Sequence, residues 1–310
     1  ASAVKPAEPR NWKYLTVRQA ASDHHRLIQL LKTIYTGKWV STGKSKGGQC
    51  AYFHRSFFPE DVDATVAYVA PMMFSREDPR ILEWVRSKLG TETVEQCENL
   101  QVTLMKNREH VLSSLSSAVD PGDLFINVDL FFELTVLNLP FDLFLRGEDI
   151  PGSLPVDSNL EEKIDFYLEV IDLSPYLKRN RNVQSTLHYQ TATELGFYSY
   201  TRDHLKQYLT YRDDLDCAAF ADHDSVPAFN VQTMTTVLNN LKDSNPRMIM
   251  IYGAQDMWSA CRIDTSGLIN TVTIVHNGSG HDVSIRDLMH SERESVYNYL
   301  REWIGIHIEN

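Results

Sequence analysis

A serine with a glycine two residues on either side constrains this chain more than any other feature. The stretch 37–49 reads GKWVSTGKSKGGQ and contains Ser45 in the pattern G-x-S-x-G. The apolar, β-favouring residues 39–42 predict a strand, and apolar residues near helical spacing over 49–58 predict a helix. This motif between a strand and a helix is typical of a nucleophile elbow, a sharp turn that exposes the serine hydroxyl.

The elbow motif makes specific demands on its neighbours. If Ser45 is held in strained geometry, Gly43 and Gly47 should approach other backbone too closely to carry a Cβ. The turn would also leave the N–H of Lys46 free to donate to an oxyanion. The alternative is a phosphate-binding loop, because residues 43–45 match the end of G-x-x-x-x-G-K-[ST]. That pattern needs glycine where the chain has Lys38, so we favour the elbow.

Composition narrows the class of protein. The 310 residues are 43% hydrophobic, which is enough for a sizeable core. The net charge of −11, without a basic stripe, argues against nucleic acid as a partner. No apolar run reaches about 18 residues, so no membrane-spanning helix is expected. Residues 1–10 lack the apolar region of a signal peptide. The four cysteines are widely spaced, and we expect no metal site and no cofactor.

The order of predicted elements indicates an α/β protein with a helical insertion. Buried-strand patterns occur at 39–42, 63–71, 247–252 and 271–276. Helical patterns cover 16–35, 79–89, 94–118, 125–138, 160–173, 202–209, 231–241 and 291–304. We therefore expect three parts: the first part of the core (1–73), a helical cap (74–228) and the second part of the core (229–310). The cap would cover the ends of the strands, where α/β folds bind ligands.

Two further residues complete a possible catalytic triad. Asp256 follows the predicted strand 247–252, and His281 follows the strand 271–276. Serine, acid and histidine then occur in the chain order of α/β-hydrolases. Asp256 would orient His281, which would take the proton of Ser45 and return it to the leaving group. Asp264 and Asp282 are alternatives for the acid, and His276 and His290 for the base.

Several segments resemble one peptidase family. Residues 41–49, 52–55, 57–59 and 61–71, together with 12–16 and 189–196, resemble the mycelial tripeptidyl aminopeptidase family of serine peptidases. More distantly, the chain is similar to the lysosomal prolyl carboxypeptidase and dipeptidyl peptidase group. The resemblance implies an α/β-hydrolase fold with a helical cap. It also implies a usually exported exopeptidase that releases short peptides, typically tripeptides, from free N-termini, often with proline near the cut.

One departure from the fold concerns the strands before the elbow. An α/β-hydrolase has several of them, and the loop after one supplies an oxyanion N–H. Only 37 residues precede Lys38, and they predict a single helix. We therefore expect a missing N-terminal segment or a second chain to complete the sheet. Two alternative functions stay open: an esterase or other acyl hydrolase with the same triad, and an inactive binding or assembly module.

An aminopeptidase also needs a group that binds the substrate's α-ammonium. Gln190 and Glu194 are at i,i+4 in a predicted helical turn of the cap and are our first candidates. The alternative is that Glu194 is a solvated helix charge or caps a loop. In that case other carboxylates of the cap would bind the α-ammonium. Trp258, beside Asp256, is a further candidate for contact with the substrate.

Overall fold

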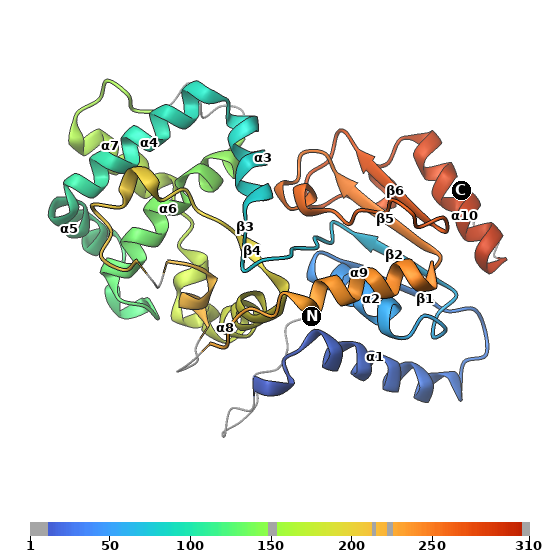
Figure 1. The fold of residues 1–310 in the computed structure, drawn as a ribbon. Coiled ribbons are helices and arrows are strands. Elements are labelled where there is room, and N and C mark those ends of the chain that lie inside the picture. Colours follow the sequence, from blue (N-terminus) through green and yellow to red (C-terminus); the bar gives the residue numbers. More distant parts are fainter. Residues whose placement is uncertain (1–11, 148–153, 213–214, 222–225, 306–310) are drawn as a thin grey trace.

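The computed structural model describes residues 12–147, 154–212, 215–221 and 226–305. Its centre is a parallel sheet of four strands: β1 (Val40–Lys44), β2 (Ala64–Tyr68), β5 (Met248–Gly253) and β6 (Thr271–His276). The strand order is β1-β2-β5-β6. Helices cover both faces of this sheet, and a separate helical block lies to one side (Figure 1). The prediction of an α/β fold is confirmed.

The central strand β5 shows why the two faces are covered. Met248, Met250 and Tyr252 point to one face, whereas Ile249 and Ile251 point to the other, as the two-residue period of a strand requires. All six residues of β5 are buried. A strand buried on both sides needs apolar residues in succession, which explains why this one was readable from the sequence.

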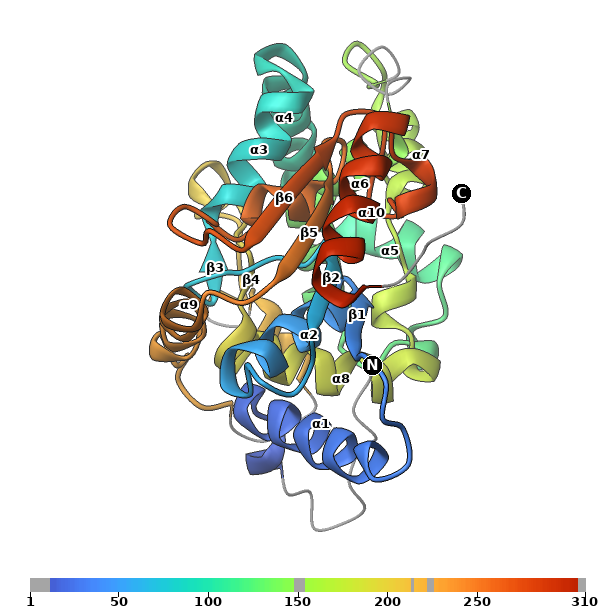
Figure 2. The same cartoon turned by 90° about the vertical axis from the view of Figure 1, so that its right-hand side faces the viewer.

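Each face has its own helices. The first is covered by α2 (Lys46–Phe57) and α9 (Gln232–Ser244), with α1 (Val17–Lys32) packed outside α2. The second is covered by α10 (His290–Ile304), whose Val296, Leu300 and Trp303 join the residues of β2 and β5. Figure 2 shows α10 against one side of the strands and α2 and α1 on the other. The carboxyl ends of the strands therefore stay open to the helical block.

The helical block lies between β2 and β5 in the sequence and has a hydrophobic core of its own. Its helices are α3 (Pro79–Leu89), α4 (Thr91–Lys106), α5 (Arg108–Ala118), α6 (Val128–Arg146), α7 (Leu160–Val170) and α8 (Arg181–Gln190). A π-helical turn, Thr191–Leu195, continues α8. Two-residue strands β3 (Glu77–Asp78) and β4 (Phe197–Tyr198) pair where the block meets the core. We call this block the cap.

The cap departs from the predicted elements in three places. The helix expected over 94–118 is two helices, because the chain turns at Asn107. The helix expected over 202–209 is only a 3-10 turn at Asp203–Leu205. Helix α8 was not predicted, since its sequence RNVQSTLHYQ has few apolar residues with which to show a helical period.

Strand β1 is at the edge of the sheet. Alternate residues of β1 are exposed, and Val40 retains 39% of its accessible surface. Within the described part of the chain, β1 pairs with β2 alone. An edge strand offers unpaired backbone groups to another strand. Further strands that complete the sheet would therefore pair with β1. Their presence stays a prediction. The export of the protein also stays a prediction.

A buried carboxylate ties α1 to the core. Asp61 Oδ2 lies 2.6 Å from His25 Nδ1 and 2.8 Å from His54 Nε2, and its Oδ1 accepts a hydrogen bond from Gln29 Nε2 at 2.7 Å. Burial by itself would raise the pKa of Asp61, but the hydrogen bonds from His25 and His54 hold it below its usual range. The charged form of Asp61 therefore stabilises the packing of α1 on α2.

Candidate active site

Ser45 occupies a strained turn between β1 and α2. Its φ of 54° and ψ of −123° are in a region that residues other than glycine rarely adopt. Its N–H donates to the carbonyl oxygen of Tyr68 at 2.8 Å, which ties the turn to the end of β2. The strand, the turn and the helix predicted for an elbow are all present around this serine.

The glycines around Ser45 have different roles from those predicted. A Cβ on Gly43 would lie 2.2 Å from the carbonyl oxygen of Gly47, so glycine is required there. A Cβ on Gly47 would meet nothing within 4 Å. The second tight position is Gly48, where a Cβ would lie 2.8 Å from that of Ala70 and 2.9 Å from the Tyr68 carbonyl oxygen. The prediction for Gly47 was wrong, because α2 turns residue 48 toward β2.

Lys46 is the first residue of α2. Its N–H belongs to the first turn, where backbone donors have no partner within the helix. An anion is favoured at this position by the same donors and by the helix dipole. The Lys46 side chain points elsewhere: its Nζ donates to Oε1 of Gln190 in the cap, and burial lowers its pKa. This contact joins the elbow helix to α8.

Asp256 and His281 come together although they are separated by a strand. Nδ1 of His281 lies 3.0 Å from Oδ1 of Asp256. The carboxylate is 3% exposed and also accepts hydrogen bonds from the Trp258 N–H at 3.1 Å and the Ser259 hydroxyl at 2.9 Å. Three partners hold the acid in place, and the bond at Nδ1 leaves Nε2 of His281 for other chemistry.

The loop after β6 brings His281 toward the elbow. Nζ of Lys44 donates to the carbonyl oxygen of Asp282 at 2.7 Å, so the residue before Ser45 is bonded to the residue after His281. No hydrogen bond joins Ser45 to His281 in the described part of the chain. Catalytic hydrogen bonds are often long before substrate binds. The Lys44–Asp282 hydrogen bond, which joins the two loops, is therefore the evidence that Ser45 and His281 are close in space.

The alternative acids and bases are engaged in other contacts. Asp264 caps a turn at Ser266. His276 lies 2.8 Å from Glu292, at the start of α10. The carboxylate of Asp282 lies 3.6 Å from Lys44 and is fully exposed, and His290 begins α10. None of these four groups is placed as Asp256 and His281 are.

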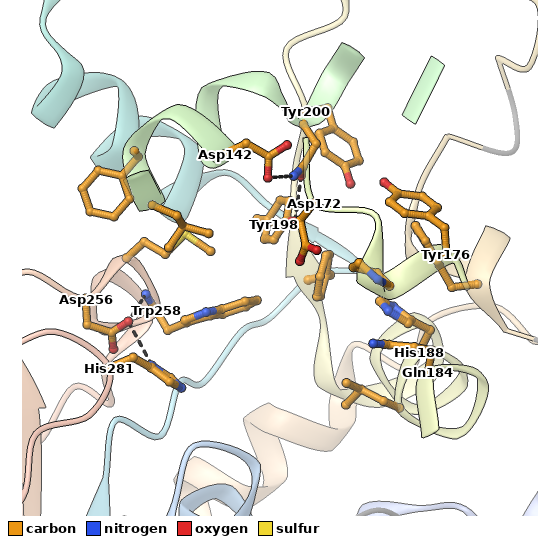
Figure 3. A pocket seen from close by; sticks show the side chains of 18 of the residues that line it. Asp142, Asp172, Tyr176, Gln184, His188, Tyr198, Tyr200, Asp256, Trp258 and His281 are labelled. Carbon is orange, nitrogen blue, oxygen red and sulfur yellow. Dashed lines mark hydrogen bonds and ion pairs between the residues drawn. The ribbon is translucent and has the colours of Figure 1, made fainter. Parts of the chain in front are cut away.

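A cavity of about 420 Å³ lies between His281 and the cap. Its walls carry aromatic rings from both sides: Tyr176, Phe197, Tyr198, Tyr200, Phe220 and Trp258. Figure 3 shows Asp256, Trp258 and His281 on one side of this cavity and Asp142, Asp172 and Tyr200 on the other. We call it the aromatic cavity. Its volume is in the usual range for a small-molecule or peptide subsite.

A second cavity, of about 540 Å³, meets the first at His281. It is lined by Lys88, Leu89 and Gly147 of the cap, by Gly280, and by four residues that also line the aromatic cavity: Phe144, Leu145, Gln255 and His281. We call it the Lys88 cavity. The histidine therefore lines both cavities, the first of which contains the carboxyl groups of Asp142 and Asp172 and the second the side chain of Lys88.

The predicted substrate residues are only partly brought to this site. Trp258 lines the aromatic cavity, 5.5 Å and 5.7 Å between ring centroids from Phe197 and Tyr198. Gln190 and Glu194 do not line it. Glu194 accepts hydrogen bonds from the Val17 N–H at 2.6 Å and from Thr233, and so caps α1.

These contacts favour the alternative in which Glu194 caps a neighbouring element, and its binding of the substrate's ammonium group stays a prediction. Gln190 and Glu194 remain four residues apart, but the π-helical turn has a wider i→i+5 pattern, so they do not share a face as they would in an α-helix.

Asp142 was not among the site residues predicted from the sequence. It follows Asn138 by one helical turn in α6, a helix of otherwise largely apolar sequence. Two polar residues at i,i+4 on such a helix were the available signal. Burial raises the pKa of Asp142 to about 7, although the hydrogen bond from Asn138 opposes this.

Comparison with known proteins places this chain in a family. The model of the family described as PS-10 peptidase S37 matches residues 2–309. The chain belongs to the peptidase S37 family. A curated relative, the prolyl tri/tetrapeptidyl aminopeptidase of Streptomyces mobaraensis, is 26% identical over 312 residues, which cover 96% of this S37 chain and 65% of the relative. The chain thus spans somewhat less than two thirds of that relative's length.

Two solved structures are similar to this S37 chain. One is from a study of carboxylesterases of Nitrososphaera gargenis, with 16% identity and a TM-score of 0.34; it covers 94% of this chain and 72% of that one. The other is a peroxisomal alpha-beta-hydrolase of Saccharomyces cerevisiae, with 14% identity and a TM-score of 0.37, covering 97% and 62%.

The described residues show neither a metal centre nor a membrane-spanning helix. No group of three histidine, cysteine or acidic side chains there is arranged to hold a metal ion, and the four cysteines are free thiols. In the same residues, no helix combines the length and the apolar character needed to cross a bilayer.

Proposed function

We propose that this chain carries the catalytic machinery of a serine exopeptidase that releases short peptides from free N-termini. The observation that carries the proposal is the Asp256–His281 pair, 3.0 Å apart, which lines a cavity and lies beside the loop of Ser45. Family membership and the name of the Streptomyces relative support a peptide substrate. That name also supports tripeptides or tetrapeptides as products and proline near the cut.

The chemistry proceeds through an acyl-enzyme. His281 accepts the proton of Ser45 at Nε2 while Oγ attacks the peptide carbonyl carbon. The Lys46 N–H donates to the oxyanion of the tetrahedral intermediate. His281 then gives the proton to the leaving amine, and the C–N bond breaks. Water, activated by the same histidine, hydrolyses the ester and frees Ser45. Asp256 keeps the imidazole oriented through Nδ1 and stabilises the imidazolium.

A serine-directed fluorophosphonate probe tests the nucleophile directly. We expect labelling of the folded chain at Ser45, no labelling of Ser45→Ala, and slower labelling of Asp256→Asn by about 10³-fold or more. A folded chain that is not labelled would instead support the inactive binding module. Labelling at another serine would refute the assignment of Ser45.

Substrate panels separate peptidase from esterase. Peptides with free and acetylated N-termini, and aryl esters of matched acyl groups, are compared by kcat/KM. The proposal requires faster cleavage of free-amine tripeptidyl substrates than of their acetylated forms. A preference for esters, with equal rates for free and acetylated peptides, would support the acyl hydrolase, because a triad alone does not determine the acyl group.

A further inference from the structure

Asp142 differs from the other buried carboxylates of the described chain. Five carboxylates there are buried: Asp61, Asp78, Glu133, Asp142 and Asp256. Four of them have a cationic or histidine partner. Asp61 and Asp256 contact histidines, Asp78 pairs with Arg80, and Glu133 pairs with Arg108 and accepts two backbone N–H groups. Asp142, 5% exposed, accepts a single hydrogen bond.

That single bond orients Asp142 within the aromatic cavity. The Tyr198 hydroxyl donates to Oδ1 of Asn138 at 2.8 Å, which leaves the amide NH₂ of Asn138 to donate to Oδ1 of Asp142 at 2.9 Å. Among the described residues, none donates a hydrogen bond to Oδ2 of Asp142. Arg146, one turn further along α6, pairs instead with Glu169 at 3.1 Å. Arg146 is near enough to oppose the rise in the pKa of Asp142, but it forms no ion pair with it. A buried carboxylate without an ionic partner is costly, so this arrangement is suited to receive a cation.

The surroundings of Asp142 also favour a cation. Asp172, from the chain after α7, lines the same cavity, and its charge acts with burial to raise the pKa of Asp142. Figure 3 shows the two carboxylates near each other, with the rings of Tyr198 and Tyr200 beside them. Aromatic faces attract an ammonium group through their quadrupole. The cavity thus combines two carboxyl groups with aromatic walls, and a cation bound there would favour the charged form of Asp142.

We infer that Asp142, assisted by Asp172, binds the α-ammonium group of the peptide substrate in the aromatic cavity. This inference rests on the proposed function. It adds the group that binds the substrate's N-terminus and so fixes how many residues lie between that terminus and the cut. In Figure 3 these carboxylates lie across the cavity from His281, so the first residues of the peptide fill the space between them. The part of the substrate beyond the scissile bond would then lie along the Lys88 cavity, which also reaches His281.

Binding to a Ser45→Ala chain tests the site without turnover. Titration calorimetry compares the tripeptide Ala-Ala-Pro with its N-acetyl form. We expect the free amine to bind about tenfold tighter or more, the discrimination that one charge-assisted hydrogen bond supplies. In the isosteric Asp142→Asn background this preference should fall to about twofold or less. Asp165→Asn, which removes the same charge from an exposed position of α7, should leave it unchanged.

The outcomes separate this inference from the proposed function. If Asp142→Asn is folded by circular dichroism and keeps the full preference for the free amine, the inference is refuted. Equal affinity of the parent for both peptides also refutes it, even when the fluorophosphonate probe labels Ser45. If the probe does not label the chain but the preference depends on Asp142, the proposed function fails and the ammonium site stands.

Discussion

Lys44 and Asp282 are 238 residues apart and are joined by a hydrogen bond of 2.7 Å from Nζ to the carbonyl oxygen. Lys44 ends β1 and Asp282 follows β6, so the contact links the two outermost strands of the sheet at their carboxyl ends. The nucleophile loop and the histidine loop are therefore held together by residues adjacent to the reacting groups.

Removal of this link should slow catalysis more than it affects stability. In Lys44→Met the loop of His281 loses its tie to the elbow, and we expect the rate of labelling at Ser45 to fall about tenfold. The melting temperature should change little, because the Lys44 side chain is 41% exposed. Lys38→Met, which removes an exposed pair with Asp63 before β1, is the matched control. Equal effects of the two variants on labelling would contradict a positioning role for Lys44.

The two glycines after Ser45 should respond oppositely to a methyl group. Gly48→Ala brings a Cβ against Ala70 and Tyr68, and we expect it to lower the free energy of unfolding by about 1–3 kcal/mol and to slow labelling of Ser45. Gly47→Ala has open space and should be neutral or stabilising, by at most about 1 kcal/mol from helix propensity. Urea unfolding of both variants measures this. A larger loss for Gly47→Ala would contradict the geometry of the turn.

Asp142 should lower stability at neutral pH. The native state keeps its proton up to about pH 7, whereas the unfolded chain releases it near the ordinary value of 3.8. The stability from the protonated form is present below that value and is lost as the pH rises through 7. Asp142→Asn should therefore gain up to about 4 kcal/mol relative to the parent between pH 4 and pH 8, at 1.36 kcal/mol per pKa unit.

Urea unfolding at pH 5 and pH 8 checks this expectation for Asp142. The groups that face it and must be considered are Asp172, Arg146, Asn138 and the tyrosines 167, 176, 198 and 200. Burial raises the pKa of each of these tyrosines, so they stay neutral over this range. Asp165→Asn should show no such pH dependence. If the free energies of unfolding of Asp142→Asn and the parent differ by the same amount at both pH values, the prediction is wrong.

Asp61 should have the opposite effect on stability. Hydrogen bonds from His25 and His54 favour its charged form, so its contribution is present above the ordinary pKa of 3.8 and is lost as the pH falls below it. Asp61→Asn should lower the free energy of unfolding by about 2–4 kcal/mol at pH 7. The exposed Asp243→Asn is the control, with an expected change within about 0.5 kcal/mol. A neutral Asp61→Asn would mean that α1 is held by apolar packing alone.

Local chemistry explains why so much of the core was readable from the sequence. The buried strand β5 needs an unbroken apolar run, and a turn at Ser45 needs glycine, so both leave a pattern within a few residues. Asp256 and His281 were predicted from their places after two such strands. Parallel strands end at one edge of the sheet, and this is why the two side chains lie 3.0 Å apart.

The polar groups of the cap could not be assigned in this way. Glu194 and Asp142 are both acidic residues in helical turns, and nothing within either segment says which one faces a cavity. Glu194 accepts a hydrogen bond from the N–H of Val17, 177 residues away, because α1 packs against the end of the cap. Asp142 was left with Asn138 as its hydrogen-bond partner and an aromatic cavity in front of it. A carboxylate's role depends on which distant donors reach it after folding, and only the tertiary packing decides that.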